Sequence, residues 1–369
     1  MDLESGILKS EETISLALRA LYARYGYVQY RMSRFEEYEL YVNNKDFLIS
    51  SDVITFTDLN GRLMALKPDV TLSIVRAWRA EPGTMQKVYY DEAVYRSSPS
   101  ARGFREIRQV GLECLGAVDD YAIGEVLMLA AESLRRISGE SALCISHLGI
   151  AGAMLDELGL HGEARTEALK CIGEKNPHEL AALCREHGIA DADAARLGRL
   201  AQLYGPPEQV LPELEALGCE AGAVAQLRRL TEMLRAGGVT EGLLLDLSVL
   251  GDMRYYNGVA FRGFVRGASA SVLSGGQYDR LLGRMGKKGR AVGFACYLDQ
   301  LERLCGDGQA YDADVLLLYD ESDTPEAVAA AVRRLVGEGQ RVSAQKAVPE
   351  KSAFRRIVKL SESGVSADA

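Results

Sequence analysis

The chain has 369 residues, 47% of them hydrophobic and 26% charged, which is the composition of an ordinary globular protein with more than one domain. Its formal charge of −9, from 43 basic and 52 acidic side chains, argues against a protein whose main task is to grip a polyanion. No apolar run approaches the roughly 18 residues that span a bilayer, and the acidic start is unlike a secretion signal. We therefore expect a cytoplasmic protein without membrane attachment.

Cysteine and histidine are used sparingly and without pattern. The seven cysteines form no CxxC pair, and the four histidines form no HxxH or HExxH spacing. Scattered cysteines in a chain without a secretion signal favour reduced, mostly buried thiols. Neither a disulfide framework nor a zinc site is predicted, and no cofactor is expected.

The first part of the chain predicts helices alternating with short strands. Apolar residues at helical spacing predict a helix from Glu11 to Tyr25, followed by a strand at 27–32. Two β-type runs within 52–66 flank Asn60-Gly61, a strong hairpin signal. Pro68 then stands just ahead of another predicted helix.

Residues 87–116 read as two strands joined by an arginine-rich loop. Side chains alternate between the two faces of a strand, so Gln109, Gly111 and Glu113 share one face. The glycine leaves space between two polar groups, which suits a small polar ligand that carries an ammonium group. The alternative is an ordinary solvated sheet face with a glycine bulge.

Amino-acid composition changes twice along the remainder of the chain. A helix is predicted at 120–138, and residues 150–240 are rich in Ala, Leu, Glu and Arg, which predicts an inserted helical subdomain. β-type segments follow, and then a helix is expected from Ala291 to Leu304. The sequence finally predicts a strand–helix–strand fragment and a disordered tail from Ser361 to Ala369.

Several segments in this order resemble the class II aminoacyl-tRNA synthetases, and histidyl-tRNA synthetase in particular. They are LKPDVT at 66–71, VYR at 94–96, RQVGLECLG at 108–116, YYNGVAF at 255–261, SGGQYDRLL at 274–282 and AVGFACYLDQL at 291–301. The resemblance implies an α+β fold, with an antiparallel sheet core flanked by helices. Residues 1–149 and 241–308 would form the core, 150–240 the helical insertion, and 309–369 a truncated α/β domain.

The same resemblance implies a binding site for histidine. Asp69 takes the place of a glutamate that holds the α-ammonium group, one methylene shorter; Asp69 or Thr71 is also a plausible helix cap. Gln109 and Glu113 match residues that bind the amino acid, and a buried carboxylate that faces an ammonium group is a favourable pairing. The predicted effector-binding residues are Asp69, Thr71, Arg96, Gln109, Glu113, Tyr255 and Tyr256. For Tyr255-Tyr256 the alternative is simply a strand-forming core.

The catalytic positions of the synthetase depart from its pattern. The Arg-x-Glu of its second motif is Arg96-Ser97-Ser98 here, and the Glu-Arg that ends its third motif is Asp299-Gln300. Gly251 replaces a catalytic arginine, Arg254 replaces an aspartate, and Gln277 stands where arginine is usual. An amide cannot replace a guanidinium that pairs bidentately with phosphate. No catalytic residue is therefore assigned.

The chain keeps the residues that bind the amino acid but lacks those that bind the ATP phosphates. In this it resembles the regulatory subunits of ATP phosphoribosyltransferase. That resemblance implies a short-form catalytic subunit as partner, histidine as feedback inhibitor, and a dimer within a hetero-oligomer, with an interface near the N-terminal helix and 31–40. A complete anticodon-reading domain does not fit in the C-terminal residues, so no tRNA partner is expected. The alternatives are a divergent histidyl-tRNA synthetase, or another synthetase-like accessory protein that binds a different amino acid.

Overall fold

The computed structural model describes residues 8–48, 53–79, 81–98, 103–250, 255–301, 311–361 and 364–367. The chain divides into two compact units, Met1–Leu304 and Cys305–Ala369. No helix among the described residues is both long and apolar enough to cross a membrane.

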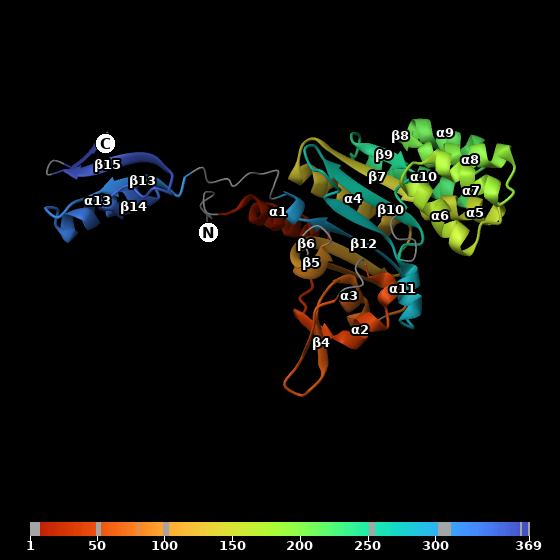
Figure 1. Cartoon of the computed structure of the whole chain (residues 1–369), viewed down its shortest axis with the longest axis horizontal. Helices are drawn as coiled ribbons and strands as arrows, with labels where there is room; N and C mark the ends of the chain where they lie inside the picture. Colours follow the sequence, from red (N-terminus) through yellow and green to blue (C-terminus); the bar gives the residue numbers. More distant parts are fainter. Residues whose placement is uncertain are drawn as a thin grey trace. The chain divides into compact units, whose positions relative to one another are not determined.

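The first unit is built on a nine-stranded sheet with the order β1-β5-β6-β12-β11-β10-β7-β9-β8 (Figure 1). The β1–β5 and β7–β9 pairs are parallel, and the other pairs are antiparallel. The strands are β1 (Val28–Gln29), β5 (Met85–Ser98), β6 (Gly103–Gly116), β7 (Ser141–His147), β8 (Tyr204–Gly205), β9 (Leu243–Asp246), β10 (Val259–Val265), β11 (Leu273–Gln277) and β12 (Arg290–Tyr297). This mixed architecture, with helices on a mainly antiparallel sheet, confirms the predicted fold class.

Helices cover this sheet and form a separate group at its far end (Figure 1). The helices of the first unit are α1 (Ser10–Arg24), α2 (Tyr38–Val42), the 3₁₀ turn η1 (Lys45–Phe47), α3 (Thr71–Ala77), α4 (Asp120–Ile137), α5 (Leu148–Glu157), α6 (Gly162–Gly173), α7 (Pro177–Glu186), α8 (Asp191–Gln202), α9 (Pro207–Ala216), α10 (Ala221–Ala236) and α11 (Asp279–Arg284). Helices α6 to α10 lie within 150–240, the segment for which the sequence predicts a helical insertion.

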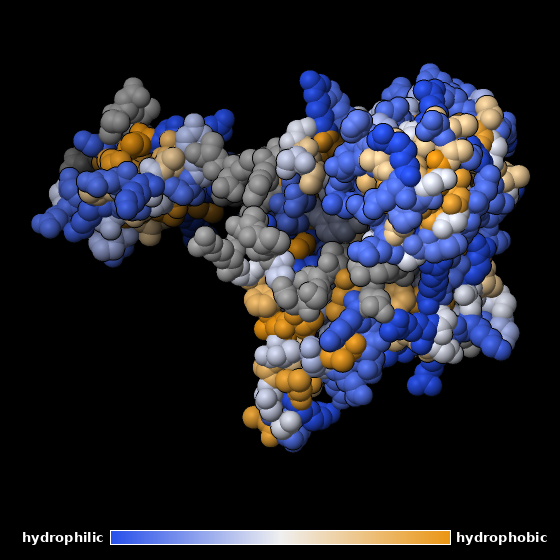
Figure 2. All heavy atoms as spheres, turned by 45° about the vertical axis from the view of Figure 1, so that its right-hand side comes forward, coloured by the Kyte–Doolittle hydropathy of each residue, from blue (hydrophilic) through white to orange (hydrophobic). Residues whose placement is uncertain are grey.

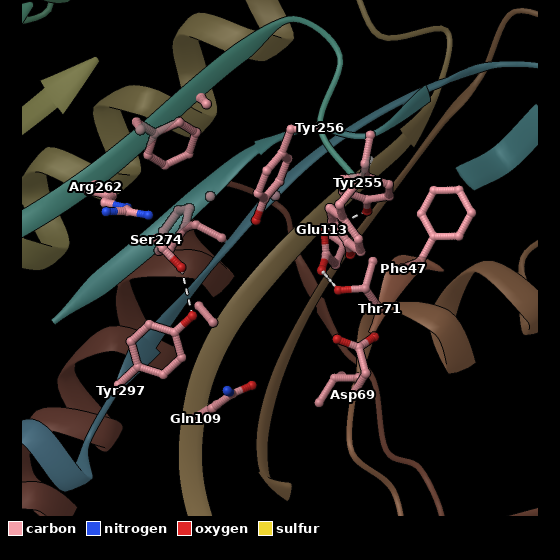
Figure 3. A pocket seen from close by; sticks show the side chains of 18 of the residues that line it. Phe47, Asp69, Thr71, Gln109, Glu113, Tyr255, Tyr256, Arg262, Ser274 and Tyr297 are labelled. Atoms are coloured by element: carbon pink, nitrogen blue, oxygen red, sulfur yellow. Dashed lines mark hydrogen bonds between the residues drawn. The ribbon is translucent and has the colours of Figure 1, made fainter. Parts of the chain in front are cut away.

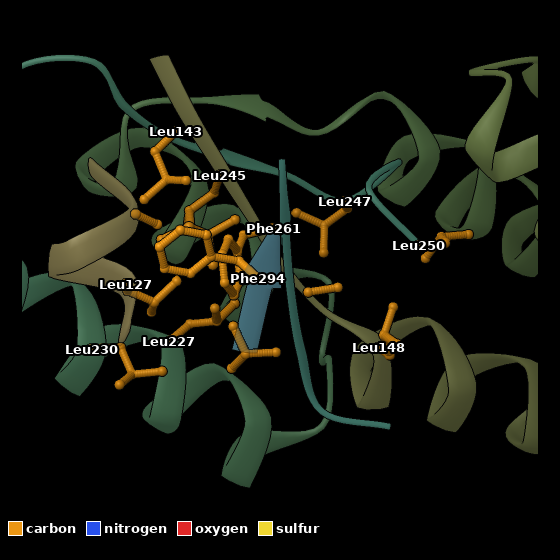
Figure 4. Packing of buried hydrophobic residues seen from close by; sticks show 14 of the residues in the cluster. Leu127, Leu143, Leu148, Leu227, Leu230, Leu245, Leu247, Leu250, Phe261 and Phe294 are labelled. Atoms are coloured by element: carbon orange, nitrogen blue, oxygen red, sulfur yellow. The ribbon is translucent and has the colours of Figure 1, made fainter. Parts of the chain in front are cut away.

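Side chains along strand β6 alternate between the large core on one face of the sheet and the opposite face. Val110, Leu112 and Cys114 are buried in the large cluster that also contains α1, α4 and α10. Figure 4 shows part of that cluster, where Phe261 and Phe294 pack among leucines of several elements. The odd-numbered residues of β6 therefore face the other way, as predicted.

A smaller apolar cluster and a second sheet lie on that other side. The three-stranded sheet has the order β2-β4-β3, from β2 (Phe35–Glu37), β4 (Leu63–Leu66) and β3 (Thr55–Thr57), and β3 and β4 form the hairpin predicted around Asn60-Gly61. Phe35, Phe56 and Leu63 are exposed there. Figure 2 shows apolar side chains over the lobe that carries this sheet.

The prediction of a helix from Ala291 to Leu304 is wrong over most of that range. Residues Arg290–Tyr297 form strand β12, between β6 and β11, and a helix begins only at Asp299. The run is apolar on both faces because both are covered, and a short, wholly apolar run does not distinguish a buried strand from a helix. Residues 302–304 lie outside the described residues.

The second unit is a four-stranded sheet with one helix. Its strands have the order β14-β13-β15-β16: β13 (Ala313–Leu318), β14 (Val342–Gln345), β15 (Phe354–Ser361) and β16 (Gly364–Ala367). Helix α13 (Pro325–Gly337) packs Ala331 and Leu335 against Val315, Leu317 and Val358. The prediction of a disordered tail is thus wrong at Ser361, which ends β15, and at 364–367, which pair with β15. Residues 362, 363, 368 and 369 lie outside the described residues.

Candidate effector-binding site

One cavity of about 420 Å³ lies on the face of the sheet opposite α1 and α4 (Figure 3). All seven residues predicted from the sequence line it: Asp69, Thr71, Arg96, Gln109, Glu113, Tyr255 and Tyr256. They come from the α3 region, from β5 and β6, and from the segment before β10, so distant parts of the chain converge here. The structure brings the whole predicted set together; which ligand it holds stays a prediction.

The floor of the cavity is open because small residues occupy the middle strands. Gly293 on β12 pairs with Glu113 on β6, and Ala295 pairs with Gly111. A Cβ atom at Gly293 would lie 1.7 Å from Oε2 of Glu113 and 2.5 Å from the backbone oxygen of Leu112. The glycine is therefore required for the Glu113 side chain to lie where it does.

Glu113 is buried and held by two hydroxyl groups. Thr71 Oγ1 donates to its Oε1 over 2.7 Å, and the Tyr278 hydroxyl donates to its Oε2 over 2.5 Å. Burial raises the pKa of Glu113 to about 8, although both hydrogen bonds oppose that rise. Near neutral pH this carboxyl group is therefore mainly protonated, and a cation that binds beside it favours loss of the proton.

Asp69 and Arg96 form a second charged group beside the first. The residue at the N-cap of α3 is Val70, neither Asp69 nor Thr71. Asp69, one residue earlier, still accepts the N–H of Leu72 at its Oδ1 over 2.8 Å in the first turn of that helix. Arg96 Nε donates to the carbonyl oxygen of Pro68 over 2.8 Å, and its Nη2 lies 3.9 Å from Asp69 Oδ2. Burial raises the pKa of Asp69 and the nearby Arg96 lowers it, with a net upward shift. Arg96 is thus engaged in holding the loop.

Aromatic side chains form one wall of the cavity. The rings of Tyr255 and Tyr256 lie edge to face with centroids 4.8 Å apart, and Tyr278 lies 5.7 Å from Tyr255. Burial is the main cause that raises the pKa of each of these three tyrosines well above its ordinary value. They therefore remain neutral and can donate or accept hydrogen bonds at physiological pH.

Several residues that line the same cavity were not predicted from the sequence. They are Phe47, Arg262, Ser274, Tyr278 and Tyr297. Ser274, Tyr278 and Tyr297 belong to quoted segments, and Tyr278 follows Gln277 directly. Arg262 depends on strand register, because it is paired with Ser274 across β10 and β11 and no local pattern indicates that neighbourhood. The hydroxyls of Ser274 and Tyr297 are hydrogen-bonded at 2.6 Å.

Gln109 lies at the edge of the cavity with an incomplete set of partners. Its side chain is buried, and its Nε2 atom has no hydrogen-bond partner among the described residues. A buried N–H group without an acceptor costs about 1–3 kcal/mol. Such a group suggests an acceptor supplied by a ligand.

The positions that resemble the ATP clamp have other partners here. The side chain of Gln277 is buried, and its Oε1 accepts the backbone N–H of Val259 over 2.9 Å. The amide of Gln300 donates to the neighbouring Asp299 over 3.1 Å. Gly251 and Arg254 lie outside the described residues. Neither glutamine carries the positive charge that a triphosphate requires.

The cavity can therefore hold a small ligand that is both cationic and polar. Two buried carboxyl groups favour a cation, and the aromatic wall favours a flat ring or an ammonium group. Within the described part of the chain, no group of three or more His, Cys, Asp or Glu side chains is arranged to hold a metal ion.

Comparisons with known proteins agree with this geometry. The family model of histidyl-tRNA synthetase matches residues 2–301. An ATP phosphoribosyltransferase regulatory subunit of Anaeromyxobacter sp. is 33% identical over 295 residues, which cover 78% of this chain and 85% of that protein. The fold is similar to that of a Bacillus halodurans protein described as an ATP phosphoribosyltransferase regulatory subunit/histidyl-tRNA synthetase, with a TM-score of 0.74, 24% identity and coverage of 95% and 93%. It is also similar to a chain of a Thermotoga maritima ATP phosphoribosyl transferase (HisG:HisZ) complex, with a TM-score of 0.62, 19% identity and coverage of 78% and 97%.

Proposed function

This chain belongs to the family of ATP phosphoribosyltransferase regulatory subunits, which are non-catalytic parts of an enzyme complex with a histidyl-tRNA synthetase-like fold, and we propose that it binds histidine and confers feedback inhibition on a short catalytic subunit. The partner would carry out the first step of histidine biosynthesis, in which ATP and phosphoribosyl pyrophosphate condense. A cytoplasmic location stays a prediction.

The observation that carries the histidine proposal is the cluster around Glu113. A carboxyl group with two hydroxyl donors and a pKa of about 8 can accept a hydrogen bond from an imidazole ring, or become an anion beside an imidazolium ion. Tyr255 and Tyr256 supply the flat aromatic surface next to it. Asp69 adds a second buried carboxyl group to the cavity, and its burial makes a pairing with a cationic ligand stronger than it would be in water.

Inhibition requires that histidine bind the inhibited form of the complex more tightly than the active form. Coupling energies of about 1–3 kcal/mol are typical, which corresponds to roughly a 5- to 150-fold change in affinity. Self-association as a dimer is supported by Phe35, Phe56 and Leu63, apolar side chains exposed on the small sheet near the interface expected at 31–40.

The decisive experiment combines the purified chain with a short ATP phosphoribosyltransferase catalytic subunit. We expect the chain to stimulate turnover and histidine to suppress the stimulated rate. Light scattering on the chain alone and on the mixture gives the mass of a dimer and of the complex. Absence of stimulation would contradict the regulatory role; a monomer at all concentrations would contradict the dimer.

The Glu113→Gln variant tests the site within the same experiment. It keeps the size of the side chain and removes its ability to become an anion, so histidine inhibition is expected to weaken at least tenfold while the light-scattering mass of the complex is retained. Unchanged inhibition would mean that histidine acts elsewhere.

A working histidyl-tRNA synthetase is the second candidate, because the family model that matches carries that name. It would exchange pyrophosphate into ATP when histidine is present. Loss of one electrostatic contact to the transition state costs about 2.7–4 kcal/mol, and the replaced arginines at Gly251 and Gln300 represent at least two such losses. We expect no exchange; histidine-dependent exchange would favour the synthetase.

A further inference from the structure

The cavity has an acidic end and a basic end, separated by small residues. Glu113 stands on β6, and Arg262 stands on β10, three strands away in the order β6-β12-β11-β10. At the usual spacing of neighbouring strands this is about 14 Å between backbones. Ala295 and Ser274 occupy the row between Gly111 and Arg262. A ligand with charges at both ends can therefore lie across the middle strands.

Arg262 differs from the other described arginine of the cavity. Arg96 already donates to a backbone carbonyl and faces Asp69. Arg262 has an exposed side chain, and no described residue forms a hydrogen bond or an ion pair with it. Its guanidinium group, which offers five N–H donors, is available to a ligand. Figure 3 shows it beside Ser274, on the side of the cavity away from Asp69 and Thr71.

A second observation points to an anionic oxygen in the same region. Gln109 Nε2 is buried, lines the cavity and lacks an acceptor among the described residues. Gln109 pairs with Tyr297, whose hydroxyl is bonded to Ser274, the cross-strand neighbour of Arg262. Donor groups thus follow one another from β6 to β10 along this edge, where an acceptor-only group would satisfy them.

We propose that Arg262 is a specificity-determining residue that binds the carboxylate of the amino-acid effector; this rests on the proposed binding of histidine. The ring then lies toward Glu113 and the carboxylate toward β10. The α-ammonium group shares a carbon with the carboxylate, so in this arrangement it lies over the middle strands and not at Asp69. One unpaired guanidinium matches a single carboxylate, whereas phosphate sites commonly combine backbone N–H groups of a glycine-rich loop or helix N-terminus with the charge. In this arrangement a histidine analogue without the carboxylate loses the contribution of Arg262.

Calorimetric titration of the full chain with histidine and with histidinol, in which an alcohol replaces the carboxylate, tests the proposal. In the Arg262→Gln variant, histidine affinity is expected to fall about 10- to 100-fold, the range of a charged hydrogen bond. Histidinol affinity is expected to stay within twofold of wild type, and Arg262→Lys is expected to recover part of the histidine affinity. Equal losses for both ligands, or no loss for histidine, would overturn the proposal.

The control is Arg266→Gln, an exposed arginine just past β10 that pairs with Glu140 outside the cavity; it is expected to leave both affinities unchanged. Titration with ATP forms another arm, because ATP binding that disappears in Arg262→Gln would assign the guanidinium to phosphate and overturn the proposal. If the wild-type chain binds histidinol but not histidine, the carboxylate contact is wrong. If it binds neither, the proposed histidine site fails, and the role of Arg262 fails with it.

Discussion

The acidic end of the cavity and the positions that resemble an ATP clamp belong to the same part of the fold but are built differently. Glu113 lines the cavity beside Gly293, and the hydroxyl groups of Thr71 and Tyr278 hold its two oxygens. Gln277 instead bonds the backbone of Val259, and Gln300 bonds its neighbour Asp299. Glu113 thus lines the cavity, whereas Gln277 and Gln300 bond to the protein and do not line it.

The largest effect on this contrast is expected from Gly293→Ala. The added Cβ atom would overlap Oε2 of Glu113 and the backbone oxygen of Leu112. Glu113 can move but the strand backbone cannot, so the variant should lose about 3 kcal/mol of unfolding free energy together with histidine binding. Urea unfolding and calorimetry measure the two losses.

Gly283→Ala is the matched control for that substitution. Gly283 lies in α11, and a Cβ atom there would meet no heavy atom within 4 Å. Because alanine is the better helix former, this variant is expected to gain up to about 1 kcal/mol and to bind histidine normally. Equal stability of the two variants would show that the space above β12 is not restricted.

Much of this contrast was readable in the sequence, because strand alternation alone placed Gln109, Gly111 and Glu113 on one face. The place of Asp69 just before a helix was also readable, and it bonds the first turn of α3 although Val70 occupies the N-cap. Strand β12 was not readable, since burial on both faces removes the alternation that marks a strand. Arg262 was missed for a related reason, because its proximity to the cavity arises only from the pairing of β10 with β11.

The pH dependence of stability provides the next test, by comparison of wild type with Glu113→Gln. The pKa of Glu113 rises from 4.5 to about 8 on folding, so the folded state holds this proton more tightly than the unfolded chain does. The resulting stabilisation is complete below about pH 4.5 and is lost as the pH rises through 8. Since each pKa unit corresponds to about 1.4 kcal/mol, wild type should lose a few kcal/mol relative to the variant between pH 5 and 9. Parallel stability curves would show that Glu113 titrates normally.

The smallest change in unfolding free energy is expected for a substitution of Gln109. The sign of that change tells whether the amide serves ligand binding or the stability of the fold. Gln109→Met removes a buried amide that has no acceptor among the described residues, so the ligand-free protein is expected to gain about 1 kcal/mol of unfolding free energy. Histidine affinity should fall in the same variant, because the ligand loses a donor. Urea unfolding and calorimetric titration measure these opposite changes.

Gln226→Met is the contrasting control, because the Gln226 amide bridges His147 and Asp120 with both hydrogen bonds made. That variant is expected to lose about 1–2 kcal/mol without a change in histidine affinity. A stabilised Gln109→Met protein that binds histidine poorly would mean that Gln109 is retained for its ligand at the expense of the fold. A destabilised Gln109→Met protein would mean that the Gln109 amide stabilises the fold, as the hydrogen bond of Gln277 to the backbone does.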